Sequence, residues 1–179
     1  MGGTFTKFQL LRHMITIAVL SWAVLLPQGS TAADSQSREG EPAEVVEYAV
    51  IVNKANVYKA EESQARVLIK KLFLKERSKW PDAKSTEAKA FDRPTDDPAH
   101  QAFVKVILGS KEALLAQHWI DLKQKTGVTA PRKVKTENMI IKFVSKKPGA
   151  FGITTLKFAE ANKENCRIFF KFKMPQSGE

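Results

Sequence analysis

Cysteine and histidine are scarce in this sequence of 179 residues. A single cysteine, Cys166, excludes an intramolecular disulfide framework and any zinc site built from several cysteines. Beyond the first 33 positions only His100 and His118 remain, and they do not cluster with other metal ligands. Cys166 lies in an apolar run typical of a strand, so we expect it to be buried rather than reactive. We therefore expect neither a metal nor another cofactor.

Motifs of the common enzyme classes are also missing. The sequence contains no GxxxxGK[ST], GxGxxG, GxSxG or HExxH pattern. No nucleophile is paired with a base, and we expect no enzymatic activity. Aromatic residues make up 9% of the chain and fall mostly on predicted apolar faces, so the sequence does not predict a base-stacking platform for nucleic acid.

Acidic residues are outnumbered, with 19 Asp and Glu against 29 Lys and Arg, and the formal net charge is +10. Such a surplus serves solubility or attracts an anionic partner, and charge alone does not separate the two. The basic residues form two clusters along the chain: Lys70, Lys71, Lys75, Arg77 and Lys79, followed by Arg132, Lys133 and Lys135. Each cluster is spaced as a solvated face, and we interpret both as sources of solubility and non-specific anion attraction.

The N-terminus has the order of a secretory signal peptide. Lys7 and Arg12 precede an apolar run at 14–26, and small residues follow up to position 33. The run is shorter than the roughly 20 residues of a membrane span, and a single uncleaved anchor is the alternative. We predict a signal peptide at 1–33 and a periplasmic or secreted protein, which excludes intracellular nucleic acid as a partner.

The rest of the chain divides by composition. The stretch at 34–44 is polar and predicts a disordered leader, 45–174 has the length of one domain, and 175–179 is a short tail. Runs rich in β-branched and aromatic residues predict strands at 45–52, 88–91, 150–156 and 166–172. Apolar residues at helical spacing predict helices at 63–73, 97–109, 110–127 and 136–147. This alternation predicts an α/β domain with a mixed sheet flanked by helices.

Capping residues mark the expected ends of these helices. Ser63, Asp97 and Thr136 have side chains suited to an N-cap, and the proline after Asp97 fits the first helical position. Gly109 and Gly127 follow the last apolar residues of their helices, where a left-handed C-cap is expected. These residues predict where the loops between helices and strands begin.

The most informative polar segment is the turn at 93–100, in which an arginine precedes a helix start. Free N–H groups and the positive end of the helix dipole attract an oxyanion there, and the Arg93 guanidinium is suited to a bidentate grip on one. In the alternative interpretation, Asp97 is only the N-cap, and its own carboxylate accepts those N–H groups. The residues leave both interpretations open.

Four segments resemble, in the same order, parts of the phosphate-binding proteins of ABC importers. They are YAVIVNKANV at 48–57, ARVLIKKLFLKERSKWPDA at 65–83, DRPTDDPAHQAFV at 92–104 and PGAFGITT at 148–155. Together they cover most of the predicted domain. The resemblance implies a type-2 periplasmic-binding-protein-like fold, of which this chain has about one lobe.

The same resemblance implies an oxyanion site at the arginine turn. In the family the turn reads R-x-D-G-S-G-T, and its Ser, Gly and Thr donate to phosphate. Here Arg93 matches, whereas Asp97 and Pro98 replace the Ser and the Gly, and an ionised Asp97 would repel phosphate and occupy its donors. The candidate ligand-binding residues are Arg93, Thr95, Ala99 and His100.

Two functions follow as hypotheses. The first is an exported solute-binding-protein-like domain that binds phosphate or another small oxyanion, with a membrane transporter or another envelope protein as its partner. The alternative is a non-transport accessory module that docks on an acidic protein or an anionic envelope polymer. The sequence does not predict the oligomeric state.

Overall fold

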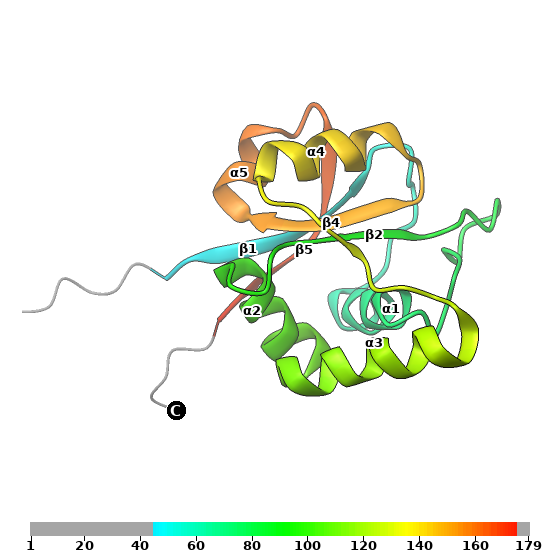
Figure 1. Cartoon of the computed structure of the whole chain (residues 1–179). Coiled ribbons are helices and arrows are strands. Elements are labelled where there is room, and N and C mark those ends of the chain that lie inside the picture. The colour runs from blue at the N-terminus through cyan, green and yellow to red at the C-terminus, as the bar shows by residue number, and fades with distance from the viewer. Residues whose placement is uncertain (1–44, 175–179) are drawn as a thin grey trace, which may run out of the picture. The chain divides into compact units, whose positions relative to one another are not determined.

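A five-stranded mixed sheet forms the centre of the domain in the computed structural model, which describes residues 45–174 (Figure 1). The strands are β1 (Glu47–Asn53), β2 (Lys89–Asp92), β3 (Arg132–Lys133), β4 (Ala150–Thr155) and β5 (Cys166–Lys173). Their order across the sheet is β3-β2-β4-β1-β5. β2 is parallel to β3 and β4, whereas β1 is antiparallel to β4 and β5. The predicted signal peptide at 1–33, leader at 34–44 and tail at 175–179 lie outside the described residues.

Helices cover both faces of this sheet (Figure 1). They are α1 (Glu62–Phe73), α2 (Pro98–Phe103) with the π-helical turn η1 (Val104–Leu108), α3 (Glu112–Thr126), α4 (Glu137–Lys146) and α5 (Leu156–Ala161). α1, α2 and α3 pack on one face, and α4 and α5 on the other. None of the helices within 45–174 is long and apolar enough to cross a membrane.

The central strand β1 explains why its sequence is apolar without interruption. Val50 and Val52 face the cluster shared with α1 and α2, while Ala49 and Ile51 face the cluster shared with α4 and α5. All four side chains are completely buried. A strand covered on both faces has no solvent side that would favour polar residues, so the alternation of a half-exposed strand is lost.

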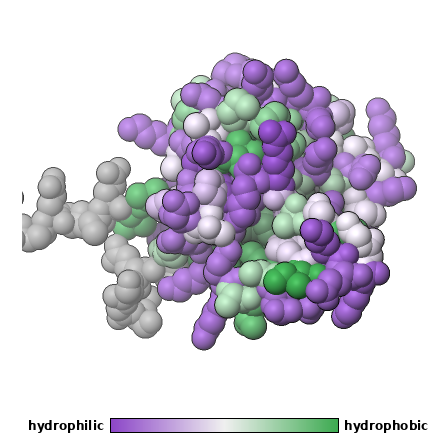
Figure 2. Space-filling view, viewed as in Figure 1, coloured by the Kyte–Doolittle hydropathy of each residue, from purple (hydrophilic) through white to green (hydrophobic). Residues whose placement is uncertain are grey.

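The helices differ in how much of their surface they bury. In α1, Ile69, Leu72 and Phe73 are almost fully buried, and each such side chain stabilises the fold by about 1.5–3 kcal/mol. α3 lies at the periphery, where Leu114 and Ile120 are 64% and 50% exposed. Figure 2 shows one of the hydrophobic patches of this face over α3. α3 is therefore the least integrated helix of the described domain.

Most of the predicted helix ends are confirmed. The Asp97 side chain accepts from Ala99 N at the start of α2, and the Thr136 side chain accepts from Met139 N at the start of α4. Gly109 and Gly127 end η1 and α3 with φ of 60° and 74°, the left-handed conformation that favours glycine. The four element ends that carry these caps are thus predicted correctly.

Other expectations were wrong in detail. Ser63 lies inside α1, because Glu61 holds the N-cap position without a side-chain bond. Ser110 does not start α3, which begins at Glu112 after Lys111. The short elements β3 and α5 were not predicted, since two and six residues are too few to show a period. The predicted strand at 150–156 ends one residue earlier, where Thr155 caps α5.

Gly149 stands where two chain segments come closest. Its carbonyl accepts from Trp80 Nε1 at 2.9 Å and from Lys89 N at 3.1 Å. A Cβ atom at position 149 would lie 1.8 Å from the carbonyl oxygen of Glu87. Only a residue without a side chain lets the segment before β2 approach the start of β4 this closely.

We expect Gly149→Ala to lower the free energy of unfolding by about 3 kcal/mol, because the clash is with backbone and no side-chain rotation relieves it. Gly127→Ala is the control, since nothing lies near its Cβ position and only the left-handed backbone opposes it, at about 1 kcal/mol. Urea unfolding of both variants measures the difference. Equal losses would contradict the close-approach explanation.

Candidate functional site

Arg93 organises the turn that follows β2. Its side chain is buried, and its guanidinium is held by three hydrogen bonds. Nε and Nη2 donate to Asp97 Oδ2 at 3.0 and 2.6 Å, and Nη1 donates to the carbonyl of Val134 at 3.2 Å. Charge-assisted bonds of this kind are roughly twice as strong as neutral ones. The donors of Arg93 are therefore aimed at a side chain of the same turn.

The carboxylate of Asp97 lies where we expected an oxyanion. Oδ2 accepts from Arg93, and Oδ1 accepts from the backbone N–H of Ala99 at 2.9 Å, which caps α2. The structure thus shows the N-cap interpretation: the donors of the turn are arranged around the chain's own Asp97 carboxylate, and binding of an external oxyanion there stays a prediction. The expectation that Asp97 occupies donors of the turn is confirmed.

His100 is completely buried one turn into α2. Its Nδ1 lies 2.9 Å from Asp92 Oδ1, and its Nε2 lies 2.7 Å from Glu112 Oε2. Asp92 also accepts from the backbone N–H of Arg93 at 2.8 Å and pairs with Lys133 at 3.2 Å. Both ring nitrogens of His100 are therefore engaged by carboxylates of the chain.

These carboxylates decide the charge of His100. Burial by itself disfavours the imidazolium, but Asp92 and, to a smaller extent, Glu112 outweigh it and raise the pKa of His100 above its ordinary value. Lys133 works weakly in the opposite direction. When it is protonated, the ring donates to both carboxylates and so joins β2, α2 and α3.

The four predicted site residues do not form one constellation. Arg93 and the N–H of Ala99 meet at Asp97, whereas His100 is bonded to Asp92 and Glu112. Thr95 is exposed and lines a hollow of about 880 Å³ beside α2 and the start of α3. Neither Arg93 nor Ala99 nor His100 lines that hollow. Their role in ligand binding stays a prediction.

The side chain of Glu137 provides a second internal carboxylate at this end of the sheet, beside the carboxyl end of β4. Glu137 Oε1 accepts from the backbone N–H of Thr155 at 2.6 Å, from its hydroxyl at 2.8 Å and from the hydroxyl of Thr154. Three donors at the start of α5 are therefore taken by a side chain of α4. The carboxyl ends of β2 and β4 both hold an anion that belongs to the chain.

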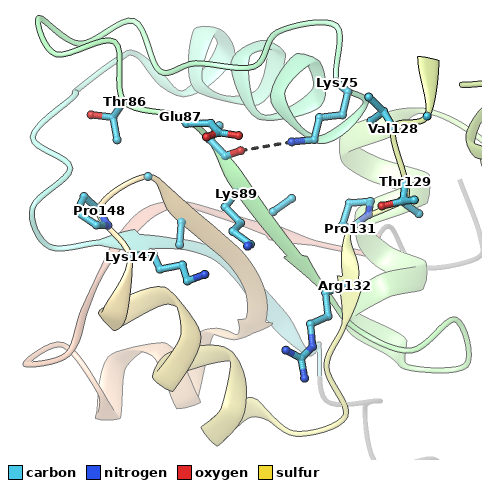
Figure 3. A pocket seen from close by; sticks show the side chains of 16 residues that line it. Lys75, Thr86, Glu87, Lys89, Val128, Thr129, Pro131, Arg132, Lys147 and Pro148 are labelled. Carbon is cyan, nitrogen blue, oxygen red and sulfur yellow. Dashed lines mark hydrogen bonds between the residues drawn. The ribbon is translucent and has the colours of Figure 1, made fainter. Parts of the chain in front are cut away.

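The opposite ends of the same strands are strongly basic. A cavity of about 790 Å³ opens there, between the starts of β2 and β4 and the segment that leads to β3 (Figure 3). Its lining contains the cations Lys75, Lys89, Arg132 and Lys147, with Glu87 as the single acid. None of these cations forms an ion pair with a residue of the described domain.

In the sequence, Lys75 and Arg132 belong to clusters spaced as solvated faces, and no local pattern joins them to Lys89 and Lys147. Lys89 is the first residue of β2, and Lys147 comes shortly before β4. Because β2 and β4 are parallel neighbours, their first residues lie side by side at the same end of the sheet. Cations placed at the starts of predicted strands are the signal that could have found this cavity.

Catalytic and metal chemistry find little support among the described residues. Cys166 is buried, as predicted, and burial raises the pKa of its thiol to about 11, so the thiol is protonated at neutral pH. Across 45–174, no group of three or more His, Cys, Asp or Glu side chains could hold a metal ion.

The fold has counterparts among solved structures. No protein-family model matches the sequence, and no curated protein matches it. An ABC-type phosphate transport receptor from Vibrio cholerae superposes with a TM-score of 0.51 at 12% identity, covering 69% of this chain and 45% of that chain. PstS from Borrelia burgdorferi gives 0.50 at 20% identity, covering 70% and 48%. The chain thus spans about half the length of these neighbours.

At such identities the likeness concerns the fold. The mixed sheet with helices on both faces matches a single lobe of a periplasmic-binding-protein-like fold, as the resemblance of the four segments implied. Fold and ligand are separate questions, because one fold hosts many unrelated sites.

The pairing of His100 makes stability depend on pH. Because the pKa of His100 is raised in the folded state, the stability that its protonated ring contributes is complete below about pH 6.5, the ordinary value. That stability is lost as the pH rises through the raised pKa.

We expect the free energy of unfolding to decrease over this pH range, and we expect His100→Gln to make the decrease smaller. His118→Gln is the control, because His118 pairs with no carboxylate of the described domain: its Nε2 lies 3.0 Å from the carbonyl oxygen of Leu74, and its ring packs edge-on against Trp119. Urea titrations between pH 5.5 and pH 8.5, roughly one unit or more on either side of a histidine pKa, measure it. An unchanged slope in His100→Gln would contradict the assignment.

Proposed function

We propose that this chain is an exported interaction module with a solute-binding-protein-like fold, which docks on an anionic envelope partner through the basic end of its sheet. The observation that carries the proposal is the distribution of charge over the two ends of the parallel strands. At one end, donors are bonded to the chain's own carboxylates, and at the other, cations have no carboxylate partner in the described domain. The signal-peptide pattern supports export.

Capture of free phosphate at Arg93 is disfavoured by competition within the turn. The Asp97 carboxylate is four residues away and is bonded by Arg93 and Ala99 N. A tethered group acts at an effective concentration of millimolar or more, so a free anion at lower concentration does not displace it. Glu137 imposes the same competition at Thr155. These contacts favour docking over small-ligand transport.

A second candidate function keeps the oxyanion at Arg93. Three N–H donors already converge on one carboxylate there. The donors of an anion site are therefore in place, but the Asp97 side chain occupies the position that an external anion would take. In this alternative the module is a receptor for phosphate or another small oxyanion, with Arg93, Thr95, Ala99 and His100 near the ligand. An oxyanion must then replace Asp97.

We expect the wild-type domain to give no binding heat with millimolar phosphate and Asp97→Ser to gain millimolar binding. Serine keeps an N-cap for α2, frees the Arg93 fork and adds a hydroxyl donor. Isothermal titration calorimetry of residues 45–174 measures both. Asp96→Ser is the matched control, because Asp96 is exposed and makes no side-chain bond within the described domain. Wild-type phosphate binding that persists in Lys89→Gln/Lys147→Gln, and so does not come from the basic cavity, would instead favour the receptor function.

Docking on a polyanion has a distinct salt signature. We expect the domain to be retained on immobilised long-chain polyphosphate or poly-glutamate at low ionic strength, and to be released as salt rises. The screening length shortens from about 30 Å at 0.01 M to about 10 Å at 0.1 M, which weakens attraction between exposed charges. Column retention at stepped salt measures this. A domain that passes both columns at low salt would overturn the proposal.

A further inference from the structure

The cavity at the basic end of the sheet concentrates positive charge from four separate parts of the chain. Lys75 follows α1, Lys89 begins β2, Arg132 begins β3 and Lys147 follows α4. Glu87, the one acid in the lining, leaves a surplus of three positive charges. Charges so distant in sequence are gathered here by the fold alone.

Lys89 and Lys147 stand closest together. Figure 3 shows their side chains ending near one another above the start of the sheet. Close contact with the Lys89 ammonium lowers the pKa of Lys147, and the guanidinium of Arg132 adds a smaller effect. Two like charges brought this near repel, and an anion bound between them relieves that repulsion.

Arg132 is held in place by aromatic packing rather than by an acid. Its guanidinium lies 4.8 Å from the ring centroid of Phe143, which stacks on Phe91 at 5.1 Å. A cation–π contact fixes the plane of the guanidinium and leaves its N–H donors free for an oxyanion. The side chain makes no hydrogen bond within the described domain.

Lys75 occupies a backbone position that favours glycine. Its φ is 61°, in the left-handed region, which costs a residue with a side chain about 1–2 kcal/mol. From this position its ammonium reaches the carbonyl of Ala88 at 3.4 Å, at the edge of the cavity (Figure 3). The left-handed backbone therefore directs a fourth cation towards β2.

We infer that this cavity binds a soluble oxyanion with two or more linked phosphoryl groups. The inference rests on the proposed function and names a site and a ligand class for it. A phosphoryl group carries about −1.5 to −2 charges at neutral pH, so one group leaves part of the surplus of three positive charges unbalanced, whereas two linked groups balance all of it. The volume of about 790 Å³ also exceeds what a single phosphate fills and lies within the usual range of small-ligand sites.

Calorimetry of the full chain with inorganic tripolyphosphate, pyrophosphate and orthophosphate tests the inference. We expect one tripolyphosphate per domain, bound at least about tenfold more tightly than orthophosphate. Lys89→Gln/Lys147→Gln should weaken tripolyphosphate about tenfold, because two partly exposed charge pairs are lost. Lys157→Gln/Lys173→Gln removes equal charge from exposed positions outside the cavity and should change affinity less than about twofold.

Several outcomes would overturn the inference. Equal weakening in both double variants would assign binding to net charge, and citrate binding as tightly as tripolyphosphate would remove the phosphoryl class. Binding to vesicles of phosphatidic acid without binding to soluble chains would place the ligand on a membrane. If Lys89→Gln/Lys147→Gln does not fold, Lys75→Asn/Arg132→Gln replaces it, since asparagine tolerates the left-handed backbone.

The proposed function and this inference fail separately. A domain that is retained on immobilised long-chain polyphosphate but gives no heat with tripolyphosphate loses the inference and keeps the function. A domain that shows neither interaction loses both. Specific tripolyphosphate binding that depends on Lys89 and Lys147 supports both.

Discussion

The parallel pairing of β2 with β4 is the constraint on which the other features of this domain depend. It aligns Lys89 with Ala150 and Phe91 with Gly152, so the two strands start at one edge and finish at the other. Each edge then collects the polar residues that flank the strands, whatever their separation in sequence. Gly149 makes this pairing possible, because the chain before β2 passes where its side chain would be. The amino ends and the carboxyl ends of β2 and β4 therefore lie at opposite ends of the sheet, and each end carries its own set of polar residues.

At the carboxyl edge, the domain satisfies its own donors. Asp97 and Glu137 occupy positions at which free N–H and hydroxyl groups would attract a free anion, and Asp92 joins β2 to His100 and Lys133. Buried polar groups are costly unless they are bonded, so internal carboxylates stabilise this edge without any ligand. We expect the same contacts to disfavour the binding of dilute phosphate at this end of the sheet. A fold shared with phosphate receptors thus does not by itself bring the ligand with it.

At the amino ends of β2 and β4, positive charges outnumber the carboxylates that could pair with them. Lys75, Lys89 and Lys147 meet no carboxylate of the described domain, and Arg132 rests on an aromatic ring. Unpaired cations at a protein surface are ordinary, but cations that crowd one another around a cavity cost stability in the absence of a counter-anion. This cost is the physical reason why we place the binding site for an anionic partner at this cavity and not at Arg93. The left-handed backbone at Lys75 also supports a binding role for this cavity, because a residue with a side chain is kept at a position that favours glycine.

The sequence by itself determined the α/β class, the four longer strands and the caps at Asp97, Thr136, Gly109 and Gly127, because each depends on residues within one turn or one period. It also indicated that Asp97 competes for the donors of its own turn. Only the tertiary structure decided that His100 lies between two carboxylates, that Glu137 reaches Thr155, and that Lys89 meets Lys147. Those contacts join residues from different elements, and their distances follow from how strands align and helices pack, which no local pattern contains.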